Sequence, residues 1–274
     1  MKNNKKKKEN QGGRLGAIEI CGRLGIDDLR YVEIEAKRRL ASEEAEDLHK
    51  YLIGRKGVRH LKRRTFFDQF LDTPELDLLK IGVSLRLRYK GDGSNVYLQY
   101  KGPGFHRHGL LFRSEFSSEK LEHVVLEESH HDAVHFRDTS VREILDKRVD
   151  PVMAAVMRRH LGRKVISRIS TGPIICLYQK DKFSVKLGDA TLEPSIDRLF
   201  AFDIHNPGLH AMSTFWEYEN EIKAEDEDFL AKLDHVEELH EFDEALTKRF
   251  DLPYERLDKY HRCAAFFLKL RKRR

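Results

Sequence analysis

The sequence predicts an α+β fold in which antiparallel strands close into a barrel with a charged lumen, flanked by helices. Many segments alternate between charged and apolar residues, and successive side chains of a strand point to opposite faces. Other segments carry apolar residues at helical spacing and can cover the apolar strand faces. A closed barrel satisfies both observations, because its apolar side lies outward under helices and its charged side lines the lumen.

Composition divides the chain into a terminal segment and one domain. Residues 1–29 begin with low-complexity sequence that includes Lys5–Lys8, and we expect this basic segment to be disordered. Residues 30–274 are expected to form one domain, with a helical insertion at about 119–162 and helices at the C-terminal end. The hydrophobic content of 40% is enough for a core.

Capping and turn residues mark the first elements of this domain. Residues 31–40 are expected to form a strand, and Ser42 is expected to cap a helix that ends near Gly54, since acidic residues occupy its first turn. Residues 65–73 have strand character. A short helix is predicted over 74–82, where proline stands at the start and glycine at the end.

Hairpins and further helices follow. Two alternating runs over 83–104 are joined by the turn sequence GDGSN, and Pro151 is expected to split the helical insertion into two helices. Strands are also predicted at 110–117, 176–193 and 215–226, and helices at 226–250 and 254–274.

The polar faces of these strands are almost purely charged. A solvated sheet surface would mix threonine, serine and glutamine with its charges. One polar residue, Asn220, stands on an otherwise apolar face. A charged lumen is costly unless its charges are paired or bind a ligand. The residues that share these polar faces are Glu33, Glu35 and Lys37; Arg86 and Arg88; Gln99 and Lys101; Arg113 and Glu115; Ser184 and Lys186; and Glu217, Glu219, Glu221 and Lys223.

The charges indicate the ligand. Guanidinium and ammonium groups suit several phosphates in a row, whereas carboxylates repel phosphate and suit Mg²⁺ or Mn²⁺. A lumen that contains both kinds of charge predicts a metal-bound polyphosphate. The candidate phosphate contacts are Arg86, Arg88, Lys101, Arg113 and Lys186, with Arg158 or Lys259 in addition.

Composition and other motifs exclude several classes. The net charge is only +5 although 35% of the residues are charged, which argues against a simple nucleic-acid coat. No apolar run or leader suggests a membrane or secretion, so we expect a cytoplasmic or nuclear protein. The three cysteines are isolated, and His130, His131 and His135 are more simply exposed histidines than metal ligands.

Six segments, in chain order, resemble the CYTH, or triphosphate tunnel metalloenzyme, superfamily. VEIEAK resembles its Glu-x-Glu-x-Lys signature, and LDKYHR resembles its C-terminal serine-lysine pair. The resemblance covers about residues 31–262. The four segments between these two are FFDQFLDTPELDLLKIGVSLRLR, YLQYKGPG, FRSEFS and FWEYENEIKAEDEDFL.

The resemblance implies an eight-stranded antiparallel tunnel over residues 30–274 that binds a triphosphate and one or two ions of Mg²⁺ or Mn²⁺. Glu35, Lys37 and Glu115 would then be catalytic, with Glu115 orienting bases or reaching a metal-bound water, and Lys259 would close one end. The metal ligands would be Glu33, Glu35, Glu219 and Glu221, and the phosphate contacts would be Lys37, Arg86, Arg88, Lys101, Arg113 and Lys186.

Three residues depart from the family pattern. Asp258 stands where the family has serine, Asp189 is one residue away from a strand-end aspartate, and Asn220 is polar where an apolar residue is expected. Each departure could alter substrate choice or abolish activity.

The function predicted is metal-dependent hydrolysis of inorganic triphosphate or a nucleoside or other triphosphate compound. Within this class RNA 5′-triphosphatase is an alternative, because the basic tails could contact a polyanion weakly. Thiamine triphosphatase, adenylyl cyclase and polyphosphate polymerase are others, although Trp216 faces outward and offers thiamine no stacking surface. The alternative of another class is a non-catalytic module that binds polyphosphate or nucleotides.

Overall fold

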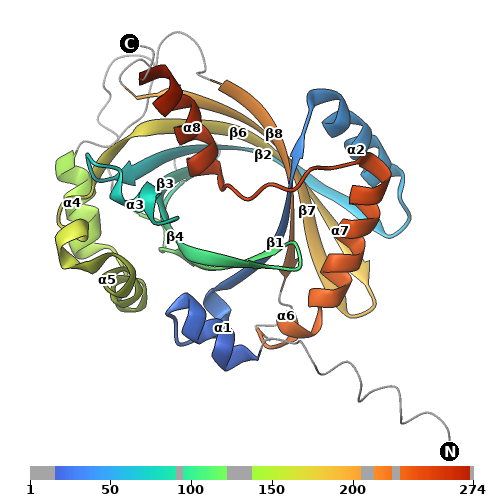
Figure 1. Cartoon of the computed structure of the whole chain (residues 1–274), viewed down its shortest axis with the longest axis horizontal. Coiled ribbons are helices and arrows are strands. Elements are labelled where there is room, and N and C mark those ends of the chain that lie inside the picture. Colours follow the sequence, from blue (N-terminus) through green and yellow to red (C-terminus); the bar gives the residue numbers. More distant parts are fainter. Residues whose placement is uncertain (1–15, 91–94, 122–137, 205–212, 224–228, 272–274) are drawn as a thin grey trace, which may run out of the picture.

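A closed eight-stranded antiparallel barrel forms the centre of the molecule (Figure 1). The computed structural model describes residues 16–90, 95–121, 138–204, 213–223 and 229–271. The strand order is β1-β5-β4-β3-β2-β6-β7-β8, and β1 closes the ring by pairing with β8 as well as β5. The predicted α+β barrel is confirmed. Its strands are β1 (Val32–Leu40), β2 (Val58–Asp72), β3 (Ser84–Lys90), β4 (Asn95–Arg107), β5 (Leu110–Ser117), β6 (Ser170–Leu187), β7 (Ala190–Asp203) and β8 (Ser213–Lys223).

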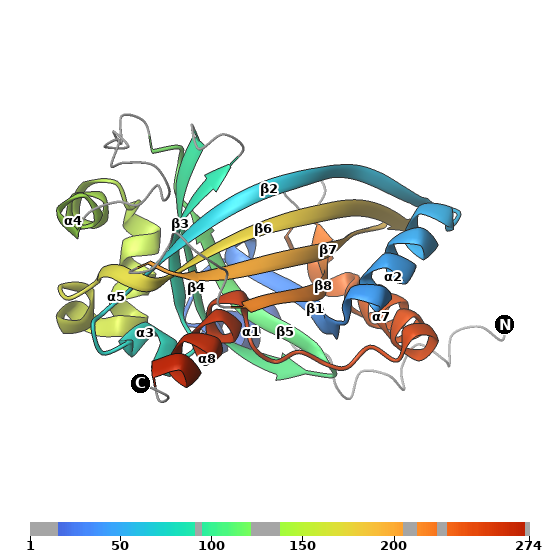
Figure 2. The ribbon, with the colours of Figure 1, turned by 90° about the horizontal axis from the view of Figure 1, so that it is seen from above.

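Helices surround the barrel. Figures 1 and 2 place α2 and α7 along one flank and α4 and α5 on the opposite flank. The insertion divides at Pro151 as predicted, because Asp150 caps the second helix by accepting the backbone N–H of Val152 at 2.9 Å. The helices are α1 (Ala17–Leu24), a 3-10 turn (Leu29–Tyr31), α2 (Ser42–Gly54), α3 (Asp77–Lys80), α4 (Asp138–Lys147), α5 (Pro151–Ile166), α6 (Ala231–Asp234), α7 (Val236–Phe250) and α8 (Lys259–Arg271).

The apolar strand faces form the main core between barrel and helices. On β1, Val32, Ile34 and Ala36 are buried and pack in the same cluster as Leu48 of α2 and Leu239 of α7. Burial of these faces fixes the register, since a one-residue slip would turn the charged residues of β1 outward. Glu33, Glu35 and Lys37 therefore point into the barrel, whereas Arg38 points outward and pairs with Asp243 of α7.

The prediction that residues 1–29 are disordered is wrong for the part that the structure describes. Residues 17–24 form α1, which ends at Gly25 in the left-handed conformation (φ 62°). Ile20 and Leu24, one helical turn apart, are buried in the main core. Two buried residues in so short a helix give little periodicity, which explains the error. Residues 1–15, including Lys5–Lys8, lie outside the described residues.

Leu24→Ala is expected to lower the free energy of unfolding by about 2–5 kcal/mol, because Leu24 is only 1% exposed and truncation leaves a cavity. Chemical denaturation measures this. Ile18→Ala in the same helix is the matched control, since Ile18 is 90% exposed and should change stability little. Equal effects of the two substitutions would contradict the docking of α1.

Several element boundaries differ from the predictions. The N-cap of α2 is Ala41 rather than Ser42, since Glu44 reaches back to accept the backbone N–H of Ala41 at 2.7 Å. The last helix begins at Lys259 rather than at residue 254. The strand predicted to end at residue 193 is two strands, the second of which continues to Asp203.

Asn220 and two of the three cysteines are buried. Asn220 is fully buried on the outer face of β8, as its position in the pattern predicted. Cys176 and Cys263 are buried and Cys21 is partly buried; all three are free. His130, His131 and His135 lie outside the described residues.

Candidate active site

The lumen contains a cavity of about 430 Å³ that is lined mainly by charged side chains. Eleven basic and seven acidic residues line it, and three further acids, Asp68, Asp197 and Glu217, pair with lining bases from behind. Of the predicted site residues, Lys186 is the exception and does not line it. The lining charged residues are Lys37, Arg64, Arg86, Arg88, Lys90, Lys101, Arg113, Lys180, Lys182, Lys223, Lys259, Glu33, Glu35, Glu115, Glu193, Glu219, Glu221 and Asp258.

Lys186 is exposed near the end of β6, and Lys180 and Lys182 line the cavity instead. The 18 residues of β6 extend roughly 60 Å at about 3.3 Å per residue, which is longer than the cavity requires. The period-two rule that selected Lys186 also gives Lys180 and Lys182, so the sequence carried this signal. The additional candidate Arg158 is likewise exposed, on α5.

Glu33 and Arg113 face each other across β1 and β5 and anchor one wall of the cavity. Glu33 accepts hydrogen bonds from Lys101 and from Arg113, each at 2.7 Å, and Arg113 also donates to Glu35 at 2.9 Å. Burial alone would raise the pKa of Glu33, but the charges of Lys101 and Arg113 hold that pKa well below its usual range. This wall is therefore a fixed array of ion pairs.

Asp68 holds the two arginines of β3 in place. Its oxygens accept from Nε and Nη2 of Arg88, both at 2.9 Å, and Nη1 of Arg86 lies 3.0 Å away. Asp68 is fully buried, so this pairing pre-organises both guanidinium groups beside the cavity. Asp68 lies within the segment that resembles the family, but sequence reasoning gave it no role.

Lys259 brings a positive charge into the lumen from the first residue of α8. Its ammonium nitrogen lies 2.9 Å from Asp197, 2.5 Å from Glu217 and 2.8 Å from Glu219. Lys180 and Lys37 also pair with Glu219, at 3.1 and 2.9 Å. Asp197 was not among the site residues predicted from the sequence. Asp189 lies in the turn between β6 and β7.

The predicted metal ligands do not form one compact group. In the described part of the chain, the lumen acids with oxygens within 4.8 Å of one another are Asp197, Glu217 and Glu219. No three of the four predicted ligands lie that close together. Instead each of the four pairs with a base, and Glu221 pairs with Lys223 at 2.8 Å.

The surroundings of Glu35 nevertheless suit a divalent cation. Glu35 stands opposite Glu221 across β1 and β8. Burial is the largest cause that raises the pKa of the Glu35 carboxyl, and the negative charge of Glu33 is the second. A cation would relieve this repulsion, and carboxylate oxygens are the ligands that Mg²⁺ and Mn²⁺ prefer. The acidic groups that could bind a metal are thus present.

Asp258, which stands where the family pattern has serine, caps α8. Its Oδ1 accepts the backbone N–H of His261 at 2.8 Å at the start of α8. The same oxygen lies 2.8 Å from Nδ1 of His261, whose Nε2 lies 2.7 Å from the carbonyl oxygen of Leu79. Both ring nitrogens face acceptors, so His261 satisfies both only as an imidazolium.

Stability is expected to fall as pH rises above about 6.5, the ordinary pKa of histidine. Burial opposes the charged form, but the Asp258 carboxylate raises the pKa of His261 overall, so the folded protein holds this proton more tightly than the unfolded chain. The contribution is complete below pH 6.5 and is lost as pH rises through the raised value. Urea denaturation between pH 6 and 9 measures it. His261→Gln should flatten this dependence; an unchanged slope would contradict the assignment.

A family model for the CYTH domain matches residues 32–250. The chain belongs to the CYTH domain family. The resemblance stated from the sequence is thereby confirmed, and the matched residues run from β1 to the end of α7.

One solved structure shows the same fold as this CYTH domain, and others are similar to it over most of their length. A putative adenylyl cyclase from Hippeastrum, described as having a dominant triphosphatase activity, is 17% identical, and the match covers 85% of this chain and 95% of that chain with a TM-score of 0.55. A protein from Pyrococcus horikoshii OT3 is 18% identical over 88% of this chain and 99% of that chain, with a TM-score of 0.49.

A putative adenylate cyclase from Bacillus halodurans is 17% identical over 83% of this chain and 94% of that chain, with a TM-score of 0.47. The 17% identity to the Hippeastrum protein shows the fold alone. The search of curated proteins found no match to this CYTH chain. Within the described ranges, none of the helices combines the length and the apolar character needed to cross a membrane.

Proposed function

We propose that this CYTH domain is a metal-dependent phosphohydrolase that cleaves inorganic triphosphate, or a compound bearing a triphosphate, in the barrel lumen. The observation that carries the proposal is the cavity of about 430 Å³ with four more basic than acidic residues in its lining. This volume is in the range of sites for small molecules. The triphosphatase activity described for the Hippeastrum relative supports the same class.

The bases are suited to hold a chain of phosphates. Arg86 and Arg88 approach from β3, Lys101 from β4 and Arg113 from β5. All four are already paired with buried or partly buried acids, so their side chains are ordered before a ligand enters. Pre-ordered groups lose less conformational entropy on binding.

All of the lumen acids pair with bases in this structure, and we divide them into two groups by the role proposed for each. We assign Glu33, Glu35, Glu219 and Glu221 to the metal, Mg²⁺ or Mn²⁺. When bound, such an ion neutralises phosphate charge and lowers the pKa of the attacking water. Asp68, Asp197 and Glu217 instead keep arginines and Lys259 in place.

The reaction proposed is attack of water in line with the terminal phosphorus. A new P–O bond forms to water and the terminal P–O–P bond breaks, which releases phosphate and leaves a diphosphate. Lys37, Arg86, Arg88 and Arg113 would stabilise charge on the phosphate oxygens. Glu115 lies 3.3 Å from Lys101 and would orient that base or accept a hydrogen bond from the water.

The cytoplasmic or nuclear location stays a prediction from the sequence.

Phosphate release is expected from inorganic triphosphate or a nucleoside, RNA 5′ or thiamine triphosphate, and only with Mg²⁺ or Mn²⁺ present. A chelator should reduce the release to background, because the bases alone do not activate water. A colorimetric phosphate assay over this panel measures it. Tight triphosphate binding without turnover, unchanged by the chelator, would favour the non-catalytic binding module instead.

A further inference from the structure

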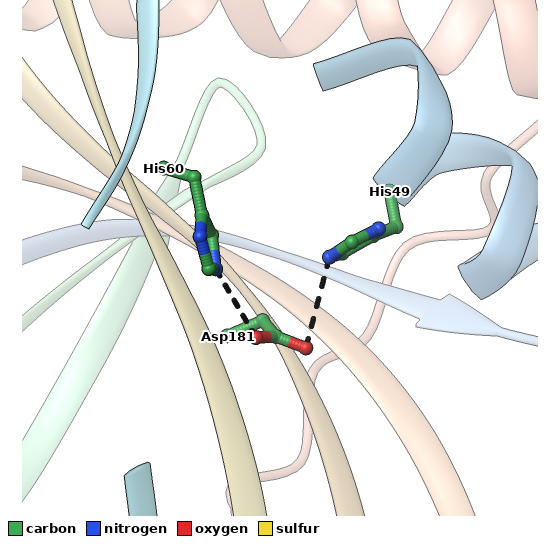
Figure 3. A group of neighbouring side chains, drawn as sticks. All are labelled: His49, His60 and Asp181. Carbon is green, nitrogen blue, oxygen red and sulfur yellow. Dashed lines mark hydrogen bonds and ion pairs between the residues drawn. The ribbon is translucent and has the colours of Figure 1, made fainter. Parts of the chain in front are cut away.

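Two histidines and an aspartate converge on the outer surface of the barrel, away from the lumen. His49 comes from α2, His60 from β2 and Asp181 from β6, and Figure 3 shows both rings turned toward the same carboxylate. Nε2 of His60 lies 3.3 Å from Oδ1 of Asp181, and Nε2 of His49 lies 3.8 Å from Oδ2. Each residue thus offers one potential ligand atom, and these atoms lie within 4.8 Å of one another.

These separations are close to those in a zinc site. Nitrogen and oxygen ligands lie about 2.0–2.2 Å from Zn²⁺, so two ligands of a tetrahedral ion are roughly 3.3 Å apart. The His60–Asp181 distance has this value, the His49–Asp181 distance is 3.8 Å, and the ligand atoms of all three residues lie within 4.8 Å of one another. Two imidazoles and a carboxylate with room for a fourth ligand match a common zinc ligand set.

The surroundings hold the rings in this position. The ring of Phe183 packs against His49 and His60, with centroids 5.6 and 5.1 Å apart. The side chains of His49 and His60 are 28% and 39% exposed, so an ion can enter from solvent. Asp181 is only 12% exposed and is fixed by the ladder between β2 and β6.

Arg63 is the group that opposes a cation here. Its Nη2 donates to Oδ2 of Asp181 at 2.7 Å, and its Nε lies 3.1 Å from Oδ1. Each carboxylate oxygen retains a second lone pair for a metal. The Arg63 side chain is 63% exposed and can turn into solvent at little cost.

We propose that His49, His60 and Asp181 form a transition-metal site for Zn²⁺, separate from the phosphate site in the lumen. The ion would join α2 to β2 and β6. Lys180 and Lys182 flank Asp181 and face the cavity. The bound ion would therefore also fix the strand that presents these two bases to the lumen. The site does not depend on the proposed hydrolase activity.

Zinc titration of the untagged full chain by calorimetry tests this, with excess Mg²⁺ present to occupy the lumen carboxylates. We expect one equivalent of Zn²⁺ to bind and to raise the thermal midpoint. His49→Gln and His60→Gln should each weaken this binding at least tenfold, because losing an outer partner of a ligand already costs about 10–100-fold. Arg63→Gln should tighten it, since a competing positive charge is removed.

His240→Gln is the matched control. His240 lies 3.7 Å from a carboxylate oxygen of Glu244 on α7, but the structure places no second histidine in a metal-binding group with it among the described residues. This variant should bind zinc as the parent protein does. Equal zinc affinity and equal thermal shifts in the parent, His49→Gln and His60→Gln would overturn the proposal, as would the absence of zinc binding by the parent.

Discussion

Glu35→Gln is expected to lower the rate of triphosphate hydrolysis by about 100-fold or more, while the barrel stays folded. The amide keeps the size of the side chain but removes a charge from the proposed metal site. Burial and the charge of Glu33 both disfavour the charged form of Glu35. Removing this charge also removes a repulsion, so the fold should persist. Steady-state phosphate release measures the rate, and circular dichroism checks the fold.

Glu244→Gln is the matched control for this experiment. Glu244 lies on α7 outside the barrel, where it pairs with Lys248, so its substitution should leave hydrolysis unchanged. If Glu35→Gln hydrolysed triphosphate as fast as Glu244→Gln, Glu35 would have no role in the reaction.

Lys259→Met is expected to destabilise the protein by about 3–5 kcal/mol, which is the usual effect of removing one partner from a buried ion pair. Methionine keeps much of the side-chain volume. Without the ammonium group, however, the buried carboxylates of Asp197 and Glu217 lose their closest cation. Urea denaturation measures the change in the free energy of unfolding.

A second substitution separates charge from packing. Asp197→Asn in the Lys259→Met background should recover part of the lost stability, because it removes one uncompensated buried charge. Lys248→Met is the control, since Lys248 is 79% exposed and its surface pair with Glu244 contributes little. Equal stability of Lys259→Met and Lys248→Met would contradict the described ion-pair cluster.

The inward faces were predictable wherever a strand alternates between charged and apolar residues. Glu33 and Glu35 could be assigned to the lumen because Val32, Ile34 and Ala36 alternate with them and must be buried against the helices outside the barrel. The same rule gave Lys186, but strand length decides which residues of a face reach the cavity. Alternation predicts which face of the sheet a side chain lies on, but it does not predict the position of that side chain along the barrel axis.

Other parts of the site needed contacts between distant segments. Asp197 was missed because Pro194 precedes it and argues against a strand interior. Asp68 had no role until the structure showed its pairs with Arg86 and Arg88, since partners about 20 residues away in sequence are not visible in a local pattern. The docking of α1 was missed because it depends on Leu24 finding a core built by other segments.

The most direct test is a crystal structure with Mn²⁺ and a triphosphate analogue whose bridging oxygens are replaced by nitrogen. Anomalous scattering locates manganese independently of other atoms. We expect manganese beside Glu33, Glu35, Glu219 or Glu221 and analogue phosphates against Arg86, Arg88 and Arg113 inside the lumen. Manganese and analogue bound only outside the barrel, with the lumen ion pairs unchanged, would contradict it.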